Sequence, residues 1–195
     1  MILFVNACVR EDSRTKRIAD HLLSTATEPI CELRLADMRF PTMDEQFIRR
    51  RDRLIAEKNF EDPLFAPARQ FAGADIIVIA APYWDLSFPA LLKQYFEQIT
   101  VVGLAFRYTP EGALQGLCRA KKLYYVTTMG GVYGSEEYGF GYVKALAQNF
   151  YGIPQVEQIK ASGLDIAGAD VEQILQDCMA SMPQIDTAKE DGPRA

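Results

Sequence analysis

A short segment near the start of the chain carries residues that could hold a phosphate group. The segment 7–17 reads ACVREDSRTKR and contains the hydroxyls of Ser13 and Thr15 and the cations Arg10, Arg14, Lys16 and Arg17. It leads into an expected helix, whose first N–H groups and dipole favour an anion. The combination is typical of a site for a phosphomonoester. The simpler alternative is that Ser13 caps the helix and the arginines are solvated.

Two planar side chains form the second candidate. Pro82, Tyr83, Trp84, Asp85 and Leu86 directly follow the apolar run 76–81. Aromatic rings exposed at a strand end are costly without a ligand to cover them, so Tyr83 and Trp84 favour a site for a flat ring. The alternative is that both rings only pack against the next helix.

Paired glycines form the third candidate, in the segment Thr128-Met129-Gly130-Gly131. Glycine allows the backbone to approach a ligand closely or to adopt a positive φ. A plain turn would use the same residues. No segment of the chain carries G-x-x-x-x-G-K-[ST] or G-x-G-x-x-G, so neither a nucleoside triphosphate nor an extended dinucleotide is indicated.

The elements that must position these segments are short strands alternating with helices. Five apolar runs predict strands, at 2–6, 30–35, 76–81, 122–127 and 155–159. The third run is uniformly apolar, as expected of a strand covered on both faces. Helical periodicity is found over 13–24, 87–101 with Ser87 as its N-cap, 142–150, and 171–179 capped by Asp170.

This alternation predicts a three-layer, doubly wound α/β fold with a five-stranded parallel sheet in the flavodoxin-like order 2-1-3-4-5. Ligands bind such sheets at the carboxyl ends of the strands, where the strand order reverses, and the three candidate segments follow strands one, three and four. We expect one domain over residues 1–182 and a polar, flexible tail over 183–195.

The connection between the second and third strands is long, from Ala36 to Asp75. Thr42-Met43-Asp44-Glu45 has a capping-box pattern that opens a helix through about Lys58, and another helix ends near Phe71. The run 49–51 of three arginines is interpreted as the solvated face of the first of these helices. The role of the insertion over 37–68 stays open.

Composition narrows the classes of function. The formal net charge of −5 gives no general basic field for nucleic acid or an anionic membrane, and no apolar run approaches a membrane span. The start of the chain does not read as a signal peptide, and four scattered cysteines indicate neither a disulfide framework nor a metal site, so we expect a cytoplasmic protein. His21 is the one histidine, which argues against Ser-His-Asp catalysis and against multi-histidine metal centres.

Together, these segments resemble those of the flavodoxin-like NAD(P)H-dependent FMN oxidoreductases, closest to the FMN-dependent azoreductase and NAD(P)H:quinone oxidoreductase group. The similarity is densest over 81–109, AAPYWDLSFPALLKQYFEQITVVGLAFRYT, and over 121–131, KKLYYVTTMGG. It implies FMN as cofactor, with the phosphate and ribityl chain held by Arg10, Ser13, Arg14 and Thr15. It further implies that residues 82–86 run along the isoalloxazine ring and that residues 128–131 lie at its pyrimidine edge.

Three positions depart from the family pattern. Asp85 stands where the family commonly has Asn, and would either disfavour a negatively charged reduced flavin or point outward and cap the helix. Met129 replaces a frequent Arg. Tyr133 replaces a histidine found in some quinone reductases and is a speculative proton donor.

The resemblance implies an enzyme that passes two electrons from NADH or NADPH through FMN to a planar acceptor such as a quinone or azo compound. It also implies a homodimer in which Phe106, Arg107 and Tyr108 wall the partner's flavin site, although these residues would equally suit a packed connection within one subunit. Two other classes remain: a flavodoxin-type electron carrier without its own substrate, and a flavin-free regulatory or binding module of the same fold.

Overall fold

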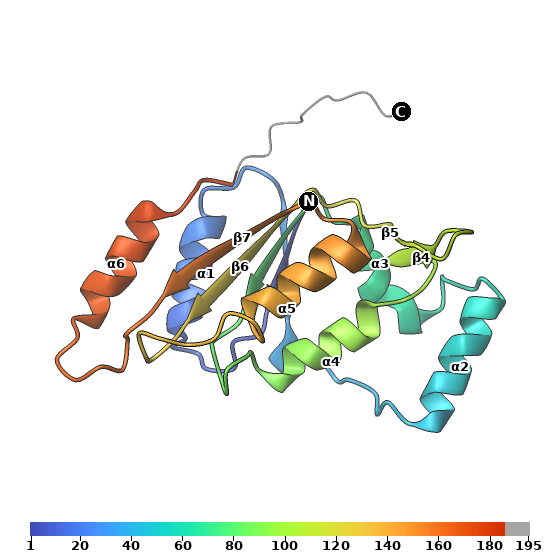
Figure 1. Cartoon of the computed structure of the whole chain (residues 1–195), viewed down its shortest axis with the longest axis horizontal. Coiled ribbons are helices and arrows are strands. Elements are labelled where there is room, and N and C mark those ends of the chain that lie inside the picture. The colour runs from blue at the N-terminus through green and yellow to red at the C-terminus, as the bar shows by residue number, and fades with distance from the viewer. Residues whose placement is uncertain (186–195) are drawn as a thin grey trace.

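The chain folds around a five-stranded parallel sheet, which the computed structural model shows together with the rest of residues 1–185 (Figure 1). The strands are β1 (Ile2–Asn6), β2 (Ile30–Arg34), β3 (Ile76–Ala80), β6 (Lys122–Thr128) and β7 (Gln155–Ala161). All five begin at the residue predicted from the sequence. Their spatial order is β2-β1-β3-β6-β7, which confirms the predicted order 2-1-3-4-5.

Helices cover both faces of the sheet and complete three layers. One face carries α1 (Arg14–Leu23) and α6 (Val171–Ser181), and the other carries α3 (Ala66–Gly73), α4 (Ala90–Ile99) and α5 (Phe140–Ala145) (Figure 1). Because side chains alternate along a strand, each inner strand supplies both cores. The central strand β3 is buried at all five positions, as its uniformly apolar sequence predicted.

Two of the predicted helix caps are confirmed. The Ser13 hydroxyl accepts a hydrogen bond from the N–H of Lys16 at the start of α1, and the Asp170 carboxylate accepts one from Gln173 at the start of α6. These caps satisfy N–H groups that have no partner within the helix.

The predicted Ser87 cap is wrong. Helix α4 begins only at Ala90, after Pro89, and the Ser87 hydroxyl instead donates to the carbonyl of Tyr138 at 2.7 Å. The reason is a tight turn in which Trp84 and Ser87 exchange two backbone hydrogen bonds, which delays the start of the helix.

The helix predicted over 142–150 is longer than expected. It begins as α5 and continues without a break as a π-helix, Leu146–Tyr151, which ends at Gly152 with a φ of 73°. A glycine readily adopts this left-handed conformation, so it stops the helix before β7.

The long connection between β2 and β3 is largely helical. It forms a 3-10 turn (Leu35–Asp37), α2 (Glu45–Ala56), a second 3-10 turn (Pro63–Phe65) and α3. The cap of α2 is Asp44 rather than Thr42, because the Asp44 carboxylate accepts the N–H of Phe47 at 2.8 Å. Helix α2 stands away from the sheet (Figure 1) and buries only Leu54.

Two of the three arginines in the run 49–51 face solvent, as predicted, whereas the Arg51 side chain is only 23% exposed and its Nε is buried, so the prediction is wrong for Arg51. Arg49 pairs with Glu45 on the same helix and Arg50 pairs with Asp62, with more than half of each arginine side chain exposed. Ion pairs of this kind contribute little to stability.

A small antiparallel hairpin was not predicted. It pairs β4 (Phe106–Tyr108) with β5 (Leu114–Gly116), and Gly112 takes a φ of 83° in its connection. Strands of three residues are too short to show a sequence period.

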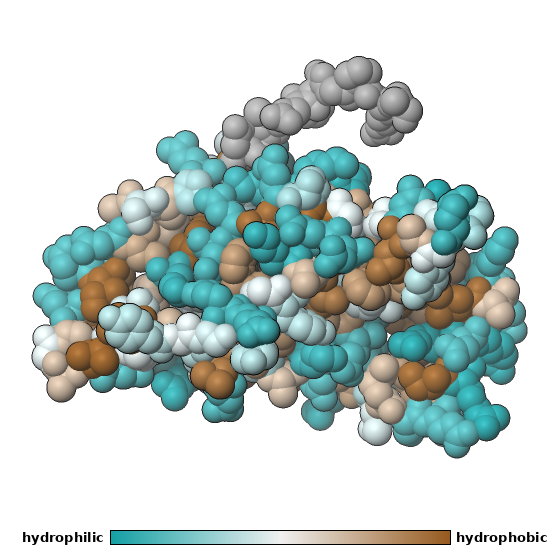
Figure 2. Space-filling model, in the orientation of Figure 1, coloured by the Kyte–Doolittle hydropathy of each residue, from teal (hydrophilic) through white to brown (hydrophobic). Residues whose placement is uncertain are grey.

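On the face shown in Figure 2 the surface is mainly hydrophilic, and the hydrophobic residues lie in small separate groups. No helix within residues 1–185 has the length and apolar character needed to cross a bilayer. At the start of the predicted tail, Ile185 is buried and its N–H donates to Thr25. The rest of that tail lies outside the described residues, so the boundary between residues 182 and 183 stays a prediction.

Candidate functional site: a cavity at the reversal of strand order

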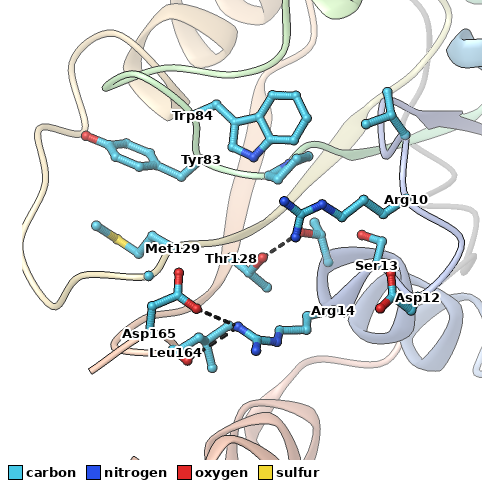
Figure 3. A pocket seen from close by; sticks show the side chains of 14 residues that line it. Arg10, Asp12, Ser13, Arg14, Tyr83, Trp84, Thr128, Met129, Leu164 and Asp165 are labelled. Carbon is cyan, nitrogen blue, oxygen red and sulfur yellow. Dashed lines mark hydrogen bonds and ion pairs between the residues drawn. The ribbon is translucent and has the colours of Figure 1, made fainter. Parts of the chain in front are cut away.

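The three candidate segments meet at one cavity of about 270 Å³ beyond the carboxyl ends of β1, β3 and β6 (Figure 3). Its lining comprises Val9, Arg10, Asp12, Ser13, Arg14, Thr15, Pro82, Tyr83, Trp84, Thr128, Met129, Gly130, Leu164 and Asp165. The convergence predicted from the strand order is therefore confirmed. Of the predicted site residues, Asp85, Leu86, Gly131 and Tyr133 do not line the cavity.

The two hydroxyls of the first segment, those of Ser13 and Thr15, already make hydrogen bonds within the protein. Ser13 caps α1, and the Thr15 hydroxyl lies 2.6 Å from the hydroxyl of Thr128 at the end of β6. Both threonines are buried, so this bond links the first segment to the third across the floor of the cavity. What remains for a ligand is the start of α1, where the first N–H groups of the helix point outward.

The four basic residues of the first segment differ in their surroundings. Lys16 pairs with Asp20 at 2.8 Å and Arg17 with Glu172 at 2.7 Å, both away from the cavity. The ion pairs within residues 1–185 leave Arg10 without a carboxylate. Its side chain extends from the first segment over the middle of the cavity (Figure 3).

Arg14 lines the cavity but is held by the protein. Its Nη1 donates to Oδ1 of Asp165 at 2.9 Å and to the carbonyl of Leu164 at 3.3 Å. The cavity lining thus contains two arginines and two aspartates, Asp12 being the second. The formal charges of these four residues cancel. Because Arg14 is already paired with Asp165, the unpaired Arg10 is the lining cation best placed to meet an anion.

The second segment supplies the upper wall. The N–H of Tyr83 donates to the carbonyl of Thr128 at 2.9 Å, and its hydroxyl donates to the carbonyl of Ser135 at 3.2 Å. Trp84 is 39% exposed at the cavity, although it is a large aromatic residue. The two rings are therefore positioned by the backbone around them and are not absorbed into the core.

Asp85 and Leu86 form the tight turn after Trp84. Their φ angles are 50° and 66°, as in a type I′ turn, and both side chains are exposed outside the cavity. The alternative in which Asp85 caps the following helix is wrong, because α4 has no side-chain cap.

The third segment lies beneath the cavity. Met129 is buried and its N–H donates to the carbonyl of Ala161 on β7 at 3.0 Å. Gly130 makes a close approach, but to the protein: a Cβ there would lie 2.2 Å from Oδ2 of Asp165. Tyr133 is 94% exposed and lies outside the cavity lining.

The segment 131–139 is anchored to β7 through Glu136, near the middle of the segment. Glu136 accepts hydrogen bonds from Lys160 and from Gln158 on β7. Partial burial acts to raise the pKa of Glu136, but these hydrogen bonds and the charge of Lys160 outweigh it and hold the pKa below its usual value.

One thiol, that of Cys8, lies within the first segment. Cys8 is buried, and burial raises its pKa, while a hydrogen bond with the Ser13 hydroxyl partly offsets this. A thiol in this state is protonated and unreactive at neutral pH. Within residues 1–185 no three His, Cys, Asp or Glu side chains are grouped to hold a metal ion.

Sequence reasoning missed Val9, Asp12, Leu164 and Asp165. The first two lie inside a segment already singled out. Leu164 and Asp165 follow β7, the fifth strand, and Gly163, two residues after the end of that strand, was the signal that its connection turns back toward the cavity.

The fold and the cavity define a class: doubly wound α/β proteins whose ligand site lies at the reversal of strand order. A family model described as "Flavodoxin-like fold" matches residues 1–185, and the chain belongs to this family.

Comparisons with individual proteins agree with this family. The chain is 36% identical over 198 residues to an FMN-dependent NADH:quinone oxidoreductase of Clostridium beijerinckii, covering 97% of this chain and 96% of the relative. A protein of the same description from Lachnoclostridium phytofermentans is 37% identical over 182 residues, with 88% and 90% covered.

Solved structures share the fold. An azoreductase from Bacillus anthracis superposes with a TM-score of 0.78 at 24% identity, covering 92% of this chain and 94% of the other. An FMN-dependent NADH-azoreductase from the same species, in complex with FMN, gives a TM-score of 0.76 at 23% identity, with 92% and 93% covered.

Proposed function

We propose that this protein is an FMN-dependent NADH oxidoreductase that passes two electrons to a planar acceptor such as a quinone or an azo compound. The observation that carries the proposal is the convergence of three segments, from the ends of β1, β3 and β6, on a cavity lined by the start of α1, by the unpaired Arg10 and by the rings of Tyr83 and Trp84. The relatives described as FMN-dependent NADH:quinone oxidoreductases support the cofactor, the donor and the acceptor class.

The residues present fit FMN. At one end, the start of α1 with Ser13 offers N–H donors to a phosphomonoester, and the unpaired Arg10, which reaches over the middle of the cavity, adds positive charge. At the other end, Tyr83 and Trp84 offer planar faces to the ring, and Met129 offers an apolar one. Thr128 and Gly130 complete the floor.

Bound FMN would supply the chemistry, by accepting a hydride from the nicotinamide and delivering two electrons to the acceptor. The protein's part is to orient and shield it. Arg10 and the start of α1 would hold the phosphate end, and Tyr83 and Trp84 would face the ring. Trp84, which is 39% exposed, would form part of the surface that a planar acceptor meets. No side chain has to act as a nucleophile.

We further propose that the protein is a homodimer in which the β4–β5 hairpin contributes to the partner's site. Phe106 is buried against Phe150, with ring centroids 5.1 Å apart, so it serves its own subunit. Arg107 and Tyr108 are exposed on the hairpin, Tyr108 by 61%, and are free to reach a second subunit. We place the protein in the cytoplasm, since its four cysteines are free thiols.

An anaerobic cycle tests the proposed function. The FMN-loaded protein is mixed with NADH and then with a soluble naphthoquinone, while the flavin absorbance is followed. We expect bleaching by NADH and rapid recovery with the quinone. A flavin that stays oxidised with NADH and with NADPH would instead favour an electron carrier, and a protein that takes up no FMN would favour a flavin-free module.

A further inference from the structure

Asp165 presents one carboxylate oxygen to the cavity without a partner. Its Oδ1 accepts a hydrogen bond from Arg14 at 2.9 Å. Its Oδ2 has no hydrogen-bond donor among residues 1–185 and lies against Gly130, where a Cβ would approach it to 2.2 Å. The side chain is 72% exposed and lines the cavity, so a ligand can reach this oxygen.

The backbone fixes the position of this carboxylate. Three consecutive N–H groups of the β7–α6 connection, at Gly163, Leu164 and Asp165, donate to the carbonyls of Gly131, Met129 and Gly130 at 2.9, 3.3 and 3.0 Å. Gly163 takes a φ of 82°, which starts the turn. Since Arg14 also holds the carboxylate, Asp165 is positioned from both its backbone and its side chain.

The place of Asp165 in the cavity indicates which part of a ligand it would meet. Figure 3 shows Asp165 with Met129 and Tyr83 at the end opposite Ser13 and Asp12. The latter end suits the phosphate, so Asp165 lies at the ring end. A fixed carboxylate oxygen there accepts a hydrogen bond, and the donor on the polar edge of a flavin ring is its imide N–H.

We infer that Asp165 recognises the ring of the cofactor by accepting its imide N–H through Oδ2, with Arg14 as the residue that positions the carboxylate. This inference rests on the proposed function. It has an electrostatic consequence: a fixed negative charge beside the polar edge opposes the negative charge that arrives on the ring at reduction, and so lowers its midpoint potential. Asp165 is thus a residue for ring recognition and for tuning the potential.

The test compares FMN with 3-methyl-FMN, in which the imide N–H is replaced by a methyl group. Dissociation constants are measured by flavin fluorescence for the wild type, Asp165→Ala and Asp165→Asn. The control is Glu172→Gln, which breaks the neighbouring exposed ion pair to Arg17 outside the cavity. The melting temperature of each apo-protein verifies that it is folded.

We expect the wild type and Glu172→Gln to prefer FMN by about tenfold or more, as for a hydrogen bond to a charged group. Asp165→Ala should bind both flavins about equally. Asp165→Asn keeps an acceptor oxygen and part of the preference, but loses the charge, so its midpoint potential should rise above those of the wild type and the control.

Two results would overturn the inference while leaving the proposed function intact. One is an undiminished preference for FMN in Asp165→Ala. The other is an equal loss of affinity for both flavins, which would assign Oδ2 to a hydroxyl of the ribityl chain. A wild type that binds neither flavin would contradict the proposed function itself.

Discussion

The Thr15 hydroxyl, at the start of α1, lies 2.6 Å from the Thr128 hydroxyl, at the end of β6. Sequence reasoning assigned Thr15 to the phosphate, but in the structure its hydroxyl joins two of the three segments that form the cavity. The first and third segments are therefore joined by a hydrogen bond of the protein itself.

This pair predicts a stability effect that is not additive. Thr15→Val would leave the buried Thr128 hydroxyl without a partner, and should lower the free energy of unfolding by about 1–3 kcal/mol. Thr15→Val with Thr128→Val removes both hydroxyls at similar volume and should recover much of that loss. Urea unfolding of the apo-proteins measures both. Losses that simply add would show that the two hydroxyls are not coupled.

Arg10 and Arg14 should differ in their effect on phosphate recognition. Arg10→Ala should weaken FMN binding by about tenfold or more and leave riboflavin, which lacks the phosphate, unchanged. Arg14→Ala should affect the two flavins alike, because Arg14 is paired with Asp165. Calorimetric titration with each flavin measures this difference. If Arg14→Ala proved selective for FMN, Arg14 would have to leave Asp165 on binding.

Asp85 should matter little to FMN affinity, although it follows Trp84 directly. Its carboxylate lies outside the cavity, in a turn where Asn also tolerates the positive φ of 50°. Asp85→Asn should therefore change the dissociation constant of FMN by no more than about twofold. A fluorescence titration decides the matter, and a loss as large as that of Arg10→Ala would place Asp85 in contact with the cofactor.

Glu136 predicts a pH dependence of stability. Its pKa is lowered in the folded protein by Lys160 and Gln158. The stabilisation should therefore be fully present above the ordinary glutamate pKa of about 4.3 and be lost as the pH falls through the lowered pKa. Unfolding of the wild type and of Glu136→Gln should differ at pH 7 and converge in acid. A difference that persists unchanged at low pH would contradict the role of this carboxylate.

The sheet could be predicted from the sequence because its signals are local. Apolar, β-branched runs mark the strands, and all five begin where predicted. The capping of α4 could not be predicted, because Ser87 reads as an N-cap until the turn at Asp85 and Leu86 is known. Leu86 takes a positive φ although leucine rarely does, so nothing in the sequence announces this turn.

Only part of the candidate site could be predicted, namely the segments that follow β1, β3 and β6, the strands at and beside the point where the strand order reverses. Asp165 was missed because it follows the edge strand β7. It reaches the cavity through a turn whose backbone is hydrogen-bonded to residues 129–131. The glycine pair was interpreted as room for a ligand, yet Gly130 makes room for Asp165. A contact between two loops of the same protein is invisible in a single sequence.

Trp84 is the chain's one tryptophan and lines the cavity, so its fluorescence reports directly on occupancy. The most direct test is to titrate the apo-protein with FMN and follow this emission. We predict strong quenching that saturates at one FMN per chain and is shifted to higher concentration in Arg10→Ala. Emission that does not respond in a saturable way would mean that the three segments do not hold this cofactor.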